Sequence, residues 1–144
     1  MRALPFSTIH FVASSVDLAQ QARDALIARH GQAPVDEAGV IVALGGDGLM
    51  LSTLHATEGL DTPVYGMNRG TVGFLMNEFS EDGLPERLNA AEEAVINPLR
   101  MRATAVDGEV TEALAINEVS ILRAGPQAAK LRISVDGRVR LPEM

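Results

Sequence analysis

Cysteine is absent from the 144 residues, and aromatic side chains make up only 3% of them. Without cysteine the chain has no disulfide, no thiolate nucleophile and no cysteine-ligated zinc or iron–sulfur site. Long apolar runs are also absent, since none approaches the roughly 18 residues that a membrane-spanning helix requires. Residues 1–5 lack the pattern of a cleaved signal peptide. We therefore expect a cytoplasmic protein with no membrane partner.

Positive charge is scarce, because 12 Lys and Arg oppose 19 Asp and Glu and the formal net charge is −7. A surface that binds nucleic acid needs basic patches that displace counterions, so we expect no nucleic-acid partner. An anionic small molecule remains open as a ligand. The backbone N–H groups at a helix start bind phosphate without any net positive charge on the protein.

Several motifs of common catalytic sites are missing as well. The chain has no G-x-S-x-G, no H-E-x-x-H, no Walker-type G-x-x-x-x-G-K-[ST] and no G-x-G-x-x-G. Its three histidines, His10, His30 and His55, have no partner at the spacing of metal ligands. We expect structural roles for them, and no metal held by side chains.

The composition that is present, 47% hydrophobic and 22% charged residues, is typical of a globular chain of about one domain's length. Over residues 1–97 apolar runs alternate with helical periodicity, which favours an α/β domain with a parallel sheet. Strands are expected at 7–13, 40–44 and 64–67, and helices at 16–30, 48–58 and 81–94. We expect Ser14 or Ser15 to cap the first helix and Gly31 to end it. Leu18, Ala22 and Leu26 are expected on its apolar face. Pro85 is expected to interrupt the last helix.

The second expected strand stops at the tetrapeptide Gly45-Gly46-Asp47-Gly48. Glycines on both sides of Asp47 let the backbone approach a ligand, and the first N–H groups of the next helix are free to bind an anion. The pattern indicates a lone carboxylate beside a phosphate-sized space. The alternative is an ordinary strand-to-helix turn in which Asp47 is the N-cap.

A second glycine-rich loop, residues 68–77, reads Asn-Arg-Gly-Thr-Val-Gly-Phe-Leu-Met-Asn and follows the third expected strand. Ligands bind beyond the carboxyl ends of parallel strands, so this loop is expected at the same edge as Asp47. The alternative is a glycine-rich connector that Phe74 anchors.

From Pro98 the pattern changes to β-hairpins. One is expected over residues 99–106 and 109–122, with Asp107-Gly108 at its turn, and another over 130–135 and 138–141, with Asp136-Gly137 at its turn. Asp-Gly favours the primed turns that match the twist of paired strands. We therefore expect an α/β nucleotide-binding domain over residues 1–97 and an antiparallel β domain over 98–144. The latter is expected to be incomplete, because a stable sheet needs three or more covered strands.

Asn117 and Glu118 interrupt a stretch that is otherwise fit for a buried strand. A buried carboxylate without a partner is costly, so some partner is expected to face Glu118. Neighbouring strand residues point to opposite faces, and both side chains reach one ligand only where the strand ends, bends or bulges. The alternative is a solvated Glu118 at an exposed edge.

Taken together, the tetrapeptide, the loop with its N-x-G-x-x-G-F-L pattern and the Asn117-Glu118 pair resemble the NAD kinase family in order and spacing. The tetrapeptide alone is shared with diacylglycerol and sphingosine lipid kinases, whereas the loop and the pair are more selective. The resemblance implies a Rossmann-like domain followed by a sandwich-like antiparallel β domain, with the dinucleotide in the crevice between them.

The resemblance also implies the site residues and the substrates. Asp47 is implied as the catalytic base that orients the adenosine ribose 2′-hydroxyl of NAD and accepts its proton. ATP is implied as phosphoryl donor, with Mg²⁺ carried by its phosphates. The implied NAD-binding residues are Gly46, Gly48, Phe74, Asn117 and Glu118.

The family continues past the last residue of this chain with a G-S-T-A-Y motif and most of the β domain, which complete the NAD site and the subunit contacts. We therefore expect a homo-oligomer when the chain is full length. A catalytically inactive nucleotide-binding fragment stays open as an alternative. A lipid kinase is a further alternative, which would leave Asn117 and Glu118 unexplained.

Two single residues complete the comparison with the family. Leu49 stands where family members often have Thr or Phe, and we expect little effect. Lys130 is expected either to be solvated or to meet a phosphate.

Overall fold

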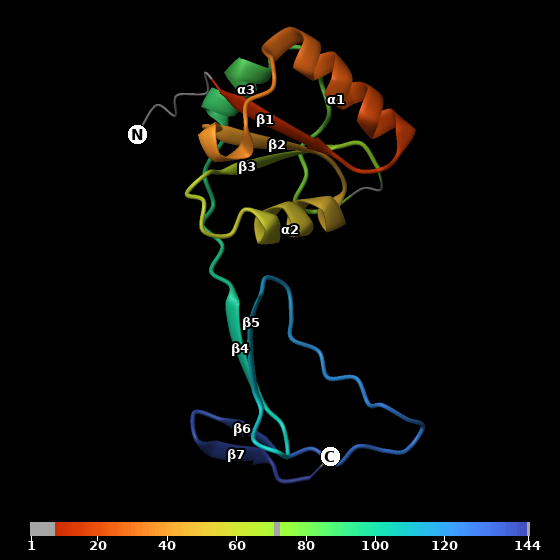
Figure 1. The fold of residues 1–144 in the computed structure, drawn as a ribbon, viewed down its shortest axis with the longest axis vertical. Helices are drawn as coiled ribbons and strands as arrows, with labels where there is room; N and C mark the ends of the chain where they lie inside the picture. Colours follow the sequence, from red (N-terminus) through yellow and green to blue (C-terminus); the bar gives the residue numbers. More distant parts are fainter. Residues whose placement is uncertain (1–7, 71–72, 144) are drawn as a thin grey trace. The chain divides into compact units, whose positions relative to one another are not determined.

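The computed structural model describes residues 8–70 and 73–143 (Figure 1). The chain divides into two compact units, residues 1–96 and residues 97–144, which are described one at a time. Within the described ranges the first unit contains every helix, and the second contains strands only. Parts of the sequence predictions, namely residues 1–5, Ser7, Thr71 and Val72, lie outside the described residues.

Three parallel strands form the sheet of the first unit: β1 (Ile9–Ala13), β2 (Val40–Gly45) and β3 (Val64–Asn68). β2 lies between the other two, and its Leu44 is opposite Met67 of β3. All six residues of β2 are buried, as is usual for a central parallel strand that is covered on both faces. The predicted parallel sheet is therefore confirmed.

Helices cover both faces of this sheet, with α1 (Asp17–His30) and α3 (Leu84–Ala90) on one face and α2 (Asp47–Ala56) on the other (Figure 1). Leu18, which the periodicity placed on the apolar face of α1, is half exposed, and Ala19 is buried instead. The main core fills the space between the strands, α1 and α3. It contains Ile9, Phe11, Ala22, Leu26, Val40, Val42, Leu44, Met67, Leu84 and Leu88.

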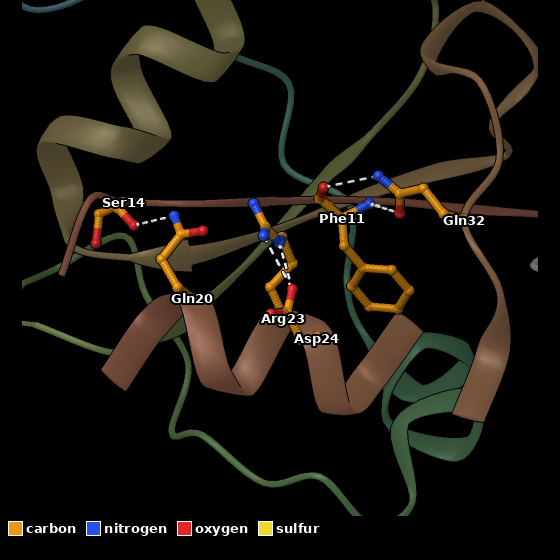
Figure 2. Close-up of polar contacts among 6 residues, drawn as sticks. All are labelled: Phe11, Ser14, Gln20, Arg23, Asp24 and Gln32. Carbon is orange, nitrogen blue, oxygen red and sulfur yellow. Dashed lines mark hydrogen bonds and ion pairs between the residues drawn. The ribbon is translucent and has the colours of Figure 1, made fainter. Parts of the chain in front are cut away.

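The start of α1 differs from the prediction, and its end agrees with it. The N-cap is Val16 and no side chain caps the helix, so the expectation of a Ser14 or Ser15 cap is wrong. Gln20 ties the first turns to the preceding loop instead, because its Nε2 donates to the carbonyl of Ser14 at 2.6 Å (Figure 2). Gly31 has a φ of +79° and its N–H donates to a carbonyl of the last turn, as expected of a glycine C-cap.

A glutamine side chain closes the free edge of β1. The Oε1 atom of Gln32 accepts from the Phe11 N–H at 2.8 Å, and its Nε2 donates to the Phe11 carbonyl at 3.0 Å (Figure 2). The N–H of Ala33 donates to the carbonyl of Ile9 at 2.9 Å. Residues 32 and 33 therefore supply the partners that a further strand would give to this edge.

The two shorter helices end sooner than the sequence predicts. α2 stops at Ala56, two residues before the predicted end at Glu58. α3 covers seven residues instead of the predicted 81–94. Pro85 lies in the first turn of α3 and does not interrupt the helix, because a first-turn residue has no intrahelical acceptor for its N–H. A short 3₁₀ helix, η1 (Val35–Glu37), precedes β2.

An ion pair joins the end of α1 to the segment before α3. Arg29 Nη1 lies 2.7 Å from Asp82 Oδ1, and Arg29 Nη2 lies 3.7 Å from Glu81 Oε2. The hydrogen bond that Arg29 donates to Asp82, and the negative charge of Asp82, raise the pKa of Arg29 above its usual value, with a smaller contribution from Glu81. The pair is exposed to solvent, so it adds little to stability.

The first hairpin of the second unit pairs β4 (Leu99–Thr104) with β5 (Val110–Ala115). Its turn is not the predicted two-residue primed turn at Asp107-Gly108. The Ala105 N–H donates to the carbonyl of Glu109 at 2.8 Å, and Gly108, whose φ is +91°, donates to the carbonyl of Ala105 at 3.0 Å. This is a three-residue loop in which glycine supplies the positive φ.

The second hairpin pairs β6 (Ile133–Val135) with β7 (Arg138–Leu141), so its first strand begins later than the predicted residue 130. Its turn residues Asp136 and Gly137 have φ angles of +51° and +74°. Two positive φ angles in succession are those of a type I′ turn, so the primed turn predicted here is confirmed.

The two hairpins form separate two-stranded sheets, so the predicted antiparallel pairing is confirmed, whereas no sandwich forms within residues 97–143. Many large apolar side chains of this unit are exposed. They include Leu99, Val110, Leu114, Ile121, Leu122, Val135, Val139 and Leu141. No helix in the described ranges has the length and apolar character needed to cross a membrane.

Candidate functional site

The turn between β2 and α2 presents the tetrapeptide at the carboxyl end of the central strand. Gly46 is the N-cap of α2, and its carbonyl accepts from the N–H groups of Leu49 and Met50 at 3.1 and 3.2 Å. Asp47 is the first helical residue, and no side chain caps the helix. The alternative in which Asp47 is the N-cap is therefore wrong, and its carboxylate is available for other contacts.

Both carboxylate oxygens of Asp47 accept hydrogen bonds from the second glycine-rich loop. The Phe74 N–H donates to Oδ2 at 2.9 Å, and the Leu75 N–H donates to Oδ1 at 3.0 Å. A Cβ on Gly73 would lie 2.5 Å from Oδ2 and closer still to the other two atoms of the carboxylate. We call Gly73, Phe74 and Leu75 the Asp47 clamp. The two motifs that the sequence placed at one edge of the sheet are thus in direct contact.

The start of the loop is fixed to the first motif by its backbone. The Arg69 N–H donates to the carbonyl of Gly45 at 2.8 Å. The side-chain oxygen of Asn68 accepts from the Gly70 N–H at 3.0 Å, which tightens the turn after β3. A Cβ on Gly70 would lie 3.7 Å from the carbonyl carbon of Gly45, an ordinary contact distance.

The end of the loop is fixed to β3. The N–H of Asn77 donates to the carbonyl of Gly66 at 2.8 Å, and the carbonyl of Asn77 accepts from the Asn68 N–H at 2.8 Å. Close packing holds the same stretch, because a Cβ on Gly66 would lie 2.5 Å from Met76 Sδ and 2.6 Å from Met50 Cε. The clamp therefore lies between two anchored positions.

The ring of Phe74 is fully exposed. It does not anchor the loop, so the alternative of a glycine-rich connector that Phe74 anchors is wrong. An exposed aromatic ring offers a flat apolar surface on which a base can stack.

Arg69 brings a cation to the same edge of the sheet. Its guanidinium lies 3.3 Å from the ring centroid of Phe79, and its Nε is buried and has no hydrogen-bond partner among the described residues. Phe79 in turn packs against the main core. The stack fixes the stem of Arg69 at the end of β3.

Asn117 and Glu118 lie directly after the end of β5, where the backbone bends at residues 116 and 117. The prediction that the strand ends, bends or bulges at this pair is therefore confirmed, whereas the strand expected over residues 109–122 is wrong in its length, because β5 stops at Ala115. Both side chains are exposed within the second unit, which agrees with the alternative of a solvated Glu118. Their role in binding NAD stays a prediction.

His10, His30 and Lys130 each have a neighbour within the chain, although the Nε2 of His30 is buried and has no hydrogen-bond partner among the described residues. His10 Nδ1 lies 2.8 Å from the carbonyl of Ala33, and the ring of His30 lies 6.4 Å from that of Phe11. Lys130 Nζ pairs with Glu143 at 3.0 Å. Within residues 8–70 and 73–143 no three His, Cys, Asp or Glu side chains gather where they could hold a metal ion.

A groove of about 640 Å³ runs beside β3 within the first unit. Its walls are mainly apolar, with Leu54, Tyr65 and Leu88 among them, and Glu92 and Glu93 lie at its side. Asp47 is not part of its lining. Leu75, whose N–H bonds to Asp47, does line it, so the groove adjoins the candidate site.

Sequence reasoning identified Asp47 and both loops, but it missed the function of Gly73 and of the backbone N–H groups of Phe74 and Leu75. The only signal was the second glycine of the loop, and its meaning depends on where a carboxylate 26 residues earlier comes to lie. Gly48 has open space around the position of a Cβ, so its predicted role in binding is not one of tight packing.

A family model described as the ATP-NAD kinase N-terminal domain matches residues 27–96, a range that contains both the tetrapeptide and the clamp. This match covers the part of the chain from the end of α1 to the end of the first unit.

Curated bacterial relatives named NAD kinase match nearly the whole chain. One from Cereibacter sphaeroides is 65% identical over 136 residues, which is 94% of this chain and 54% of the relative. One from Caulobacter vibrioides is 59% identical over 143 residues, 97% of this chain and 54% of the relative. One from Rhizobium meliloti is 51% identical over 142 residues, 99% of this chain and 55% of the relative. The chain thus spans about half the length of the curated relatives it matches.

Proposed function

Since the chain belongs to the NAD kinase family, we propose that the protein transfers the γ-phosphoryl group of ATP to the 2′-hydroxyl of the adenosine ribose of NAD, which gives NADP and ADP. The observation that carries the proposal is the carboxylate of Asp47, held at the carboxyl end of β2 by two backbone N–H groups. It is positioned to meet an incoming hydroxyl.

In this proposal Asp47 accepts a hydrogen bond from the 2′-hydroxyl and directs its oxygen toward the γ-phosphorus of ATP. The new bond joins that oxygen to phosphorus, the bond from phosphorus to the β-phosphate oxygen breaks, and the hydroxyl proton passes to Asp47. A carboxylate is a weak base for an alcohol, so Asp47 acts mainly by orientation and accepts the proton late. Phosphoryl transfer depends chiefly on such positioning and on charge neutralisation.

The other site residues follow from the same reaction. Gly46 and Gly48 keep the turn around Asp47 free of side chains, so the ribose can approach the backbone. The exposed ring of Phe74 stacks on the adenine. Asn117 and Glu118 bind the ribose and the nicotinamide side of NAD.

Mg²⁺ enters this proposal with the nucleotide. The side chains of the described residues do not fit a metal site of their own, because no three potential ligands gather. ATP carries Mg²⁺ on its phosphates, where the ion offsets their charge. We further propose that the protein works in the cytoplasm and assembles as a homo-oligomer.

The test is an activity assay on two proteins, this chain alone and the product of its reading frame read on past Met144. We expect the second protein to form NADP from NAD and ATP. If the longer product is active and the chain alone is inactive, the first 144 residues would be assigned to nucleotide binding. Phosphorylation of diacylglycerol or sphingosine, with no NADP formed, would overturn the proposal in favour of a lipid kinase.

A further inference from the structure

We propose that Gly73 is a positioning residue for the reaction, because the space that it leaves is the space that the Asp47 carboxylate fills. The inference rests on the proposed function for its catalytic consequence. Its structural half, that residue 73 and the carboxylate compete for one volume, stands on the contacts alone.

The clamp orients the carboxylate but occupies only some of its hydrogen-bond acceptor positions. A carboxylate has about four lone-pair positions on its two oxygens. The N–H groups of Phe74 and Leu75 occupy one position on each oxygen and so fix the plane of the group. No other hydrogen bond reaches the carboxylate from the described residues, so the remaining positions can accept a bond from a substrate hydroxyl while both N–H groups stay bound.

The clamp can fix the carboxylate because its own ends are fixed. On one side Arg69 donates to the carbonyl of Gly45, two residues before Asp47. On the other side Asn77 bonds to Gly66 in β3. Phe74 and Leu75 are therefore held relative to the same sheet that carries Asp47.

Residue 73 is a glycine for reasons of space. The backbone angle φ of Gly73 does not lie in the left-handed region, so an alanine would not be strained by conformation. An alanine Cβ would overlap the carboxylate and would either rotate Asp47 or lift the clamp from it. Gly70, in the same loop and also outside that region, has room for a Cβ at ordinary contact distance and provides a matched control.

The first experiment is a double-mutant cycle in thermal stability, and it needs no activity. We expect Gly73→Ala to lower the Tm by about 5 °C or more when Asp47 is present. Combined with Asp47→Ala, which removes the carboxylate, Gly73→Ala should change the Tm by less than about 2 °C. Gly70→Ala should shift the Tm equally in both backgrounds. Equal effects of Gly73→Ala in both backgrounds, or failure of the double variant to fold, would overturn the inference.

The second experiment measures kinetics on the longest product of the reading frame. A displacement of about 1 Å at the reacting group costs about 100-fold, so we expect Gly73→Ala to lower kcat by about that factor. The KM for ATP should change by less than about threefold, because the clamp holds the acceptor side. A kcat within about threefold of wild type would overturn the inference. If the wild-type protein forms no NADP, the proposed function fails, and the stability cycle still decides whether Gly73 positions Asp47.

Discussion

The backbone N–H of Leu75 donates a hydrogen bond to Asp47 Oδ1 at 3.0 Å, across 28 residues of sequence. Together with the bond from Phe74 to the other oxygen, it joins two glycine-rich segments into one structural unit. The carboxylate that the proposed reaction needs therefore belongs to the segment after β2, and it is held by the segment after β3.

The first prediction concerns the fold of Asp47→Asn. An asparagine keeps one acceptor oxygen, but its NH₂ group faces the N–H of either Phe74 or Leu75, so one hydrogen bond is lost. We expect a loss of about 1 kcal/mol in the free energy of unfolding, because the site is exposed to water. Urea denaturation measures it, with Asp36→Asn on the exposed surface as the control. A loss above about 3 kcal/mol would contradict this account of the contact.

The second prediction concerns the core. Leu26 is fully buried between α1 and the sheet, so Leu26→Ala should lower the free energy of unfolding by about 2–5 kcal/mol. Leu18→Ala, in the same helix at a side chain that is 52% exposed, should cost much less. Both values come from denaturant unfolding. Equal losses would mean that α1 packs with a different face toward the sheet.

The third prediction concerns the edge of β1. Gln32→Ala removes both bonds to the backbone of Phe11, and we expect a loss of about 1–3 kcal/mol. Amide exchange at Phe11 should accelerate as well, since its N–H loses its acceptor. Gln21→Ala, at an exposed position of α1, is the control. Unchanged exchange at Phe11 would contradict the role of the glutamine side chain.

The fourth prediction concerns the second unit. Asn117→Ala in the longest product of the reading frame should raise the KM for NAD by about tenfold, as expected for the loss of one well-made hydrogen bond. The KM for ATP should stay the same. Steady-state kinetics measure both, with Ser120→Ala at a nearby exposed position as the control. A selective rise in the KM for ATP would place Asn117 on the donor side.

Sequence patterns predicted the fold well wherever the residues of one segment determine the structure of that segment. The apolar run of β2 identified a buried central strand, and Asp136-Gly137 identified a primed turn. The same dipeptide at 107–108 gave a longer loop, because the hydrogen bonds around Ala105 and not the dipeptide alone set the turn. The prediction that Ser14 or Ser15 caps α1 was wrong for a similar reason, since the side chain of Gln20, within the helix, donates to the carbonyl of Ser14.

The proximity of the two glycine-rich segments could be predicted from the sequence, but the contacts between them could not. The order of strands placed Asp47 and the loop at one edge, and the structure brings them together. The competition between Gly73 and the carboxylate depends on how two loops meet in space, which no pattern within either loop contains. For the same reason the sequence alone did not identify the N–H donors.

The most direct test of the central claim compares ATP-dependent conversion of NAD to NADP by the wild-type protein and by Asp47→Asn, both made as the longest product of the reading frame. We predict that the wild-type protein forms NADP and that Asp47→Asn, folded and still able to bind ATP, turns over at least about 100-fold more slowly. A variant that kept most of the wild-type rate would contradict the assignment of Asp47 as the group that orients and deprotonates the 2′-hydroxyl.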